Sequence, residues 1–187
     1  MTLTDLLVPT YRNGLRMLLG LLDKTEAQRG ADQAEALLSA RLAPDMWPLA
    51  TQLRFAALQA MEGLQRLRGD PPPDEFETIL NEGRNAGEHP GTLAEARARI
   101  DQALAYIDAL GPRALDGVRE DAPMVLDLPN GMTFDLTHDQ FARDWALGQF
   151  YFHVMAAYAI LRKEGVEIGK RDYVPHMFGY LRAAEVA

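Results

Sequence analysis

Four long segments with helical periodicity, separated by strong helix breakers, restrict the fold of this chain more than any other feature. In each segment apolar residues recur every three or four positions, so they fall on one face of an amphipathic helix. These positions are Leu15, Leu18, Leu19 and Leu22; Leu49, Leu53, Ala56, Ala60 and Leu64; Ile100, Leu104 and Ile107; and Phe141, Trp145, Phe152, Ala156 and Ile160. Gly30, residues 69–73 and residues 111–112 end the first three segments, because glycine and proline terminate helices. The pattern predicts an all-α protein built as a four-helix bundle.

Local signals place several of the helix ends. Asp45 is expected to cap the second long helix, with Pro48 in its first turn, where proline is tolerated. Residues 92–95 and 137–140 have capping-box spacing, a Thr followed three positions later by Glu or Gln, and predict the starts of the third and fourth helices. Gly165 is expected just beyond the end of the fourth helix.

The segments between the long helices are long enough to contain structure of their own. Residues 31–38 predict a short helix, whereas residues 74–91 fit either a short helix or an exposed loop. Asn130-Gly131 between two alternating apolar segments indicates a β-hairpin over about residues 124–136. The tail, residues 166–187, is expected to pack on the bundle through Ile168, Tyr173, Met177, Phe178 and Leu181. We therefore expect a single domain, residues 1–187, with long crossovers instead of a simple up-and-down order.

Composition restricts the location and the partners of the protein. A net charge of -8 and a pI near 5.0 disfavour nucleic-acid binding, because an acidic chain repels phosphates. The chain has no cysteine, which excludes disulfides, thiolate metal sites and cysteine nucleophiles and is compatible with a reducing cytoplasm. No apolar stretch reaches the roughly 20 residues of a membrane span, and the first residues lack the positive charge of a secretion signal. The sequence therefore predicts a soluble cytoplasmic protein with no nucleic-acid or membrane partner.

Two motifs carry a resemblance to a known group of proteins. Residues 148–162 read GQFYFHVMAAYAILR and are followed by Gly165-Val166 and by GKRDY at residues 169–173; residues 41–46, before the second long helix, read RLAPDM. Together these motifs resemble an uncharacterised bacterial family, a domain of unknown function within the DinB/YfiT-like superfamily. The resemblance extends over nearly the whole chain. It implies a four-helix bundle that is commonly dimeric.

The resemblance also implies where a site would lie. Many superfamily members bind a divalent metal through three histidines, one on the second bundle helix and two, at i and i+4, on the last. Some metal-bearing relatives, such as maleylpyruvate isomerases and low-molecular-weight-thiol transferases, act on thiol-linked substrates. In this chain His153 corresponds to the second histidine of the last helix, but Gln149 and Gln52 stand at the other two positions. Because an amide oxygen is a poor ligand for zinc or nickel beside imidazole, these three residues should hold such a metal weakly.

Three interpretations of these residues remain open. In the one we favour, they form a satisfied buried polar network without a chemical role, the usual explanation of a lone core histidine. In another, they line a metal-free pocket that binds a small molecule, with His153 as an acid or base and Tyr151 and Tyr158 as further hydrogen-bond donors. In the last, a divalent metal remains and is completed by other residues, such as Asp45 or His176.

For function, the sequence predicts an uncharacterised DinB-like bundle protein that lacks the full three-histidine metal site and binds a small molecule in a polar core pocket. The alternative is a metal-dependent transferase or isomerase of the thiol-linked branch. Catalysis is left open, because kinship of fold is weak evidence for an activity. A second copy of the chain and a small-molecule ligand are the expected partners.

Overall fold

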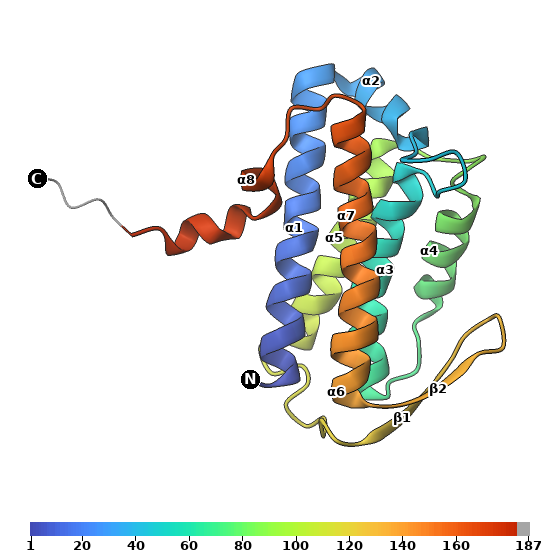
Figure 1. Cartoon of the computed structure of the whole chain (residues 1–187), viewed down its shortest axis with the longest axis vertical. Helices are drawn as coiled ribbons and strands as arrows, with labels where there is room; N and C mark the ends of the chain where they lie inside the picture. The colour runs from blue at the N-terminus through green and yellow to red at the C-terminus, as the bar shows by residue number, and fades with distance from the viewer. Residues whose placement is uncertain (183–187) are drawn as a thin grey trace, which may run out of the picture.

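Four long helices form a bundle in the computed structural model, which describes residues 1–182 (Figure 1). They are α1 (Leu3–Arg29), α3 (Leu49–Arg68), α5 (Leu93–Leu110) and α7 (Leu147–Lys163). α1 and α7 run in one direction along the bundle, and α3 and α5 run in the other (Figure 1). The connection between α3 and α5 contains α4 (Asp74–Asn85), which packs against α3. This arrangement confirms the predicted four-helix bundle with long crossovers.

The core lies between the four helices and is built from their apolar stripes. The predicted stripe of α3 is buried throughout, and Leu15, Leu18 and Leu22 of α1 are buried as well. Burial of one such leucine side chain contributes about 2 kcal/mol relative to leaving it in water. The largest fully buried side chains are aromatic: Tyr11, Phe141 and Phe150.

The buried face of the last helix differs from the prediction. Phe152 is 55% exposed, so its assignment to the core is wrong. The cause is a π-helical turn, η2 (Phe141–Ala146), between α6 (His138–Gln140) and α7. A π turn holds more residues than an α turn, so the buried stripe advances along the sequence after Phe141. The core side of α7 contains Phe150, His153, Val154, Ala156, Ala157, Ile160 and Leu161.

The two predicted capping boxes are present. Thr92 and Glu95 satisfy each other's backbone donors at the start of α5, and Thr137 and Gln140 do the same before α6. Gly165 adopts a left-handed φ of 78° after α7, and the Val166 amide donates to the carbonyl of residue 161. This pair of features is a Schellman ending, which satisfies carbonyls that the helix leaves free.

The expected cap of α3 is wrong. α3 begins at Leu49, so Pro48 occupies the cap position and Asp45 lies exposed in the preceding loop. The extended ψ of 168° at Pro48 turns the chain into the helix without a side-chain cap. Arg41, the first residue of the RLAPDM motif, closes this loop by donating from Nη1 to the carbonyl of Met46 at 2.6 Å.

Short helices occupy two of the crossovers. α2 (Ala31–Ala36) and the 3-10 helix η1 (Leu37–Ser39) follow α1 as predicted. α4 resolves the ambiguous segment in favour of a helix. Gly83 on α4 permits a close approach to α3, because a Cβ at this position would overlap the ring of Phe55.

The predicted hairpin is formed by β1 (Pro123–Asp127) and β2 (Thr133–Thr137), which pair antiparallel with Val125 opposite Asp135. Its turn uses only Gly131 at positive φ, with a hydrogen bond from the Gly131 amide to the carbonyl of Leu128. The ribbon lies at the end of the bundle where α7 begins (Figure 1).

The C-terminal segment, residues 166–182, only partly follows the expected packing. Val166 and Ile168 are buried, and α8 (Lys170–Tyr173) lies beside α1, where Lys24 donates to Asp172 at 2.5 Å. The 3-10 helix η3 (Pro175–Tyr180) then leads away from the bundle (Figure 1). The expected burial of three side chains is wrong: they are the exposed Met177, Phe178 and Leu181. The end of the predicted tail, residues 183–187, lies outside the described residues. Among residues 1–182 no helix is long and apolar enough to cross a membrane.

Candidate functional site

His153 and Gln52 form a buried pair between α7 and α3. The Nδ1 atom of His153 lies 2.8 Å from Oε1 of Gln52, and the Gln52 amide donates from Nε2 to the carbonyl of Trp47 at 3.1 Å. Gln52 is fully buried and His153 is 7% exposed. Because an amide oxygen only accepts, Nδ1 must carry the proton that is shared with Gln52. The imidazole is therefore held in one tautomer by a hydrogen bond across the bundle.

Aromatic rings cover this pair on the outer side. The ring centroids of Phe55 and Phe152 each lie 5.3 Å from that of His153 in edge-on geometry, and Trp47 contacts Phe55 edge-on at 6.3 Å. Burial among these rings lowers the pKa of His153 to about 4, because a charged imidazolium loses its hydration there. At neutral pH His153 is consequently an uncharged hydrogen-bond donor.

The residues at the inferred metal position do not fit a transition metal. Gln149 is half-buried one turn before His153, and within residues 1–182 its side chain has no hydrogen bond to His153 or Gln52. Asp45 is exposed in its loop, and His176 lies in a separate cleft beside α1. In the described part of the chain, no three His, Asp or Glu side chains are grouped so that they could hold a metal ion. One imidazole that already shares its Nδ1 proton with an amide is not a ligand set for zinc or nickel.

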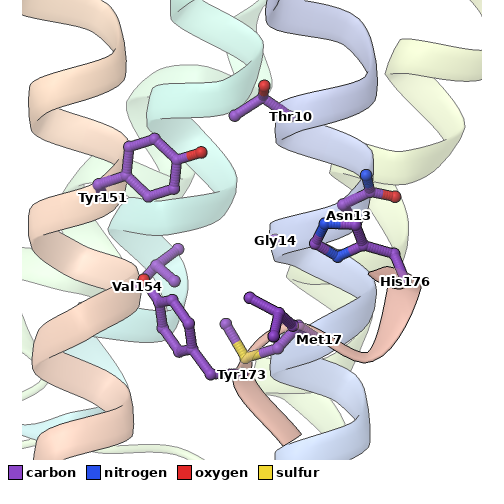
Figure 2. Close-up of a pocket in the computed structure, with 9 residues that line it drawn as sticks. Thr10, Asn13, Gly14, Met17, Tyr151, Val154, Tyr173 and His176 are labelled. Carbon is purple, nitrogen blue, oxygen red and sulfur yellow. The ribbon is translucent and has the colours of Figure 1, made fainter. Parts of the chain in front are cut away.

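A cleft of about 200 Å³ opens between α1, α7 and the C-terminal segment (Figure 2). Tyr151 points from α7 across the cleft toward α1, while Asn13 and His176 border the opposite side (Figure 2). Gly14 allows the ring of Phe150 to pack against α1 at this wall, because a Cβ there would lie 2.6 Å from that ring. The cleft is thus shaped by helix packing and closed on one side by the C-terminal segment.

Four polar side chains of this cleft have no hydrogen-bond partner in the described part of the protein, whereas Thr10 donates to the carbonyl of Leu6. Within residues 1–182, the side chains of Asn13, Tyr151, Tyr173 and His176 form no hydrogen bond. Burial and the neighbouring Tyr151 raise the pKa of Tyr173, so its hydroxyl remains a donor. Tyr158 supports Tyr173 from behind, with the two ring centroids 5.4 Å apart. These groups can bind a small molecule by hydrogen bonds and by contact with aromatic faces.

The structure therefore separates the residues that the sequence grouped together. Gln52 and His153 meet in the core, and Gln149 stays apart from them. Tyr151 lines the cleft on the α1 side of α7, whereas Tyr158 does not line it and only contacts Tyr173. Four cleft residues on α1, Thr10, Asn13, Gly14 and Met17, are absent from the predicted site. In the sequence Thr10 and Asn13 resemble ordinary surface positions and Met17 resembles a core residue, so no local signal could have found them.

The fold is that of a DinB-like helical bundle protein. A crystal structure of a DinB family member from Shewanella denitrificans is similar to this chain, with a TM-score of 0.72 and 33% sequence identity over 92% of this chain and 91% of the other. Residues 3–174 match the family described as Domain of unknown function (DUF1993), and the chain belongs to this family. Comparison with curated proteins gives no match. The resemblance inferred from the two motifs is confirmed.

Proposed function

We propose that this DinB-like protein binds a small polar molecule in the cleft between α1, α7 and the C-terminal segment, and that the Gln52–His153 pair maintains the bundle. The cleft is smaller than the roughly 300–1,000 Å³ of drug-sized pockets, so its ligand has few non-hydrogen atoms. No Asp, Glu, Lys or Arg is among its lining residues, which favours an uncharged ligand. No observation on residues 1–182 favours the alternative, a metal-dependent transferase or isomerase.

One observation carries this proposal: side chains from three different elements direct unpaired polar groups into the same small volume. Asn13 comes from α1, Tyr151 from α7 and His176 from η3. Tyr151 is 46% exposed and His176 is exposed, so water supplies their hydrogen-bond partners when the cleft is empty. A ligand with both donors and acceptors would supply those partners.

Fragment binding measured by ligand-observed NMR tests the proposal. A set of small uncharged phenols, amides and heteroaromatic compounds should give binders of the wild-type protein, and Tyr151→Ala or Asn13→Ala should weaken them about fivefold or more. Tyr180→Ala and Asn130→Ala are matched controls, because both residues are exposed and lie outside the cleft. Binders that respond to neither cleft variant, or an absence of binders, would refute the proposal.

We also propose that two copies of the chain associate through the aromatic surface that covers His153. Trp47 and Phe152 are 45% and 55% exposed, and ring contacts through Phe55 and His153 join them into one patch. Met155, 48% exposed, follows Phe152 by three positions on α7 and extends the same helix face. Contiguous apolar patches are uncommon on monomeric proteins and mark interaction surfaces.

A further inference from the structure

A second cleft, of about 490 Å³, lies between α3, α4, the hairpin and the π-helical turn η2. Its apolar wall includes Leu80, Leu126 and Trp145, which come from three of these elements. The volume falls within the range of about 300–1,000 Å³ that is typical of small-molecule sites. π-helical turns inside α-helices occur frequently at functional sites. The proposed function does not use this cleft.

Charges of both signs line this cleft and do not neutralise one another by direct contact. Arg66 and Arg84 form no ion pair with any carboxylate of residues 1–182, although nine other arginines and lysines of this part do. Glu62 and Asp127 also line the cleft without an ion pair to a described residue. Glu62 is half-buried, and this burial raises the pKa of its carboxyl. The cleft thus offers two guanidinium groups without ion pairs and two carboxylates, of which Glu62 accepts a hydrogen bond from Gln59 and Asp127 accepts one from Thr133, beside an apolar wall.

A buried hydroxyl lies behind the α3 wall of this cleft without lining it. The Tyr11 side chain is 0% exposed, and its hydroxyl has no hydrogen-bond partner among the described residues. The hydroxyl reaches Gly63, a residue that lines the cleft, and a Cβ at Gly63 would overlap it. The absence of a side chain at Gly63 thus lets Tyr11 pack against α3 behind the wall of the cleft.

We propose that this second cleft binds a free α-amino acid with an apolar side chain. The carboxylate of such a molecule would pair with Arg66 and Arg84, because a guanidinium group forms paired hydrogen bonds with a carboxylate. Its ammonium group would face Glu62 and Asp127, and its side chain would lie against Trp145. A ligand of one charge would leave the lining charges of the same sign unbalanced, whereas a zwitterion matches both.

Calorimetric titration with charge-deleted analogues tests the ligand class. The probes are L-phenylalanine, L-leucine and L-methionine, together with 3-phenylpropionate, which lacks the ammonium group, and 2-phenylethylamine, which lacks the carboxylate. At least one amino acid should bind, and each phenyl analogue should bind about tenfold more weakly than L-phenylalanine, because each lacks one charge-assisted interaction. Equal binding of an analogue, or no binding of any of the three amino acids at millimolar concentration, would overturn the proposal.

Variants locate the binding in this cleft. Arg84→Gln and Glu62→Gln should each weaken amino-acid binding about tenfold, whereas Arg16→Gln, a change at an exposed arginine of α1 outside the cleft, should not. Unchanged affinity in both Arg84→Gln and Glu62→Gln would overturn the assignment. Tyr151→Ala alters only the first cleft, so amino-acid binding should not respond to it. A failure of this proposal is thereby distinguished from a failure of the proposed function.

Discussion

At the scale of single residues, the pairing of His153 with Gln52 explains how the bundle accommodates a polar pair in its core. The hydrogen bond between Nδ1 and the amide oxygen satisfies both buried groups, and the rings of Phe55 and Phe152 exclude water from the imidazole. The same desolvation makes protonation of His153 unfavourable. The stability of the fold is therefore linked to pH through this residue.

His153→Gln should reduce the pH dependence of stability below neutral pH. The pKa of His153 is lowered from 6.5 to about 4 on folding, so the unfolded chain binds more protons between these values. Stability then rises with pH across this window and is lost as the pH falls through it. Between about pH 7 and about pH 5 the wild-type protein should lose about 2 kcal/mol more unfolding free energy than the variant does. Urea denaturation at both pH values measures this difference.

His89→Gln provides the comparison for this experiment, because His89 is exposed in the loop before α5. The unfolding free energy of His89→Gln should depend on pH as that of the wild-type protein does. If His153→Gln and His89→Gln lose the same free energy on acidification, His153 is not the desolvated neutral group that the structure indicates.

Sequence reasoning identified which residues could meet in this region but not how they meet. Spacing of i and i+4 places Gln149 and His153 on one face of α7, yet only His153 bonds to Gln52. Which of two neighbouring side chains reaches across the bundle depends on the rotation of the helix, and η2 changes that rotation. No pattern of residues in the sequence predicts the extra residue of a π turn.

At the scale of helices and strands, glycines show where packing overrides helix propensity. Gly14 and Gly20 both lie inside α1, but only Gly14 has a neighbour at its Cβ position, the ring of Phe150 at 2.6 Å. A Cβ at Gly20 would meet no atom within 4 Å. Glycine in a helix interior reduces stability because the unfolded chain gains conformational freedom.

The two alanine substitutions should therefore have opposite effects. Gly20→Ala should stabilise the protein by about 0.5–1 kcal/mol, because alanine restricts the unfolded chain and meets no obstacle. Gly14→Ala should destabilise it by about 1–3 kcal/mol, because the methyl group overlaps the buried Phe150 ring and the core has little freedom to move. Chemical denaturation of both variants measures the difference, and equal effects would show that α1 and α7 are not in close contact at Gly14.

Elements whose signals are local were predictable from the sequence. The capping boxes at Thr92 and Thr137 and the Gly165 ending involve residues within six positions of each other, so the sequence contains them in full. Asp45 has the same chemistry as a helix cap, but Pro48 already directs the chain into α3. Asp45 and Pro48 are both signals for the start of a helix and lie three residues apart. The sequence alone does not show which of them starts α3, because that depends on the loop geometry that Arg41 imposes.

At the scale of the whole molecule, the clefts arise from elements that are far apart in the sequence. The first joins α1 to α7 and to the C-terminal segment, and the second joins α3 and α4 to the hairpin. The bundle was predictable because each helix carries its own stripe, whereas the clefts depend on how the helices cross. The exposed end of the C-terminal segment has the same origin, since its apolar residues predicted packing but η3 leads away from the bundle (Figure 1).

The aromatic surface over His153 should hold two copies of the chain together in solution. Light scattering after size-exclusion chromatography at micromolar concentration should give twice the 20.8 kDa of one chain. Phe152→Glu combined with Met155→Glu should give the monomer mass, because burying carboxylates at an apolar interface without partners is strongly unfavourable. Val125→Glu, at an equally exposed apolar residue of the hairpin, should remain dimeric. A wild-type monomer, or dissociation by Val125→Glu alone, would show that the patch over α7 does not join two chains.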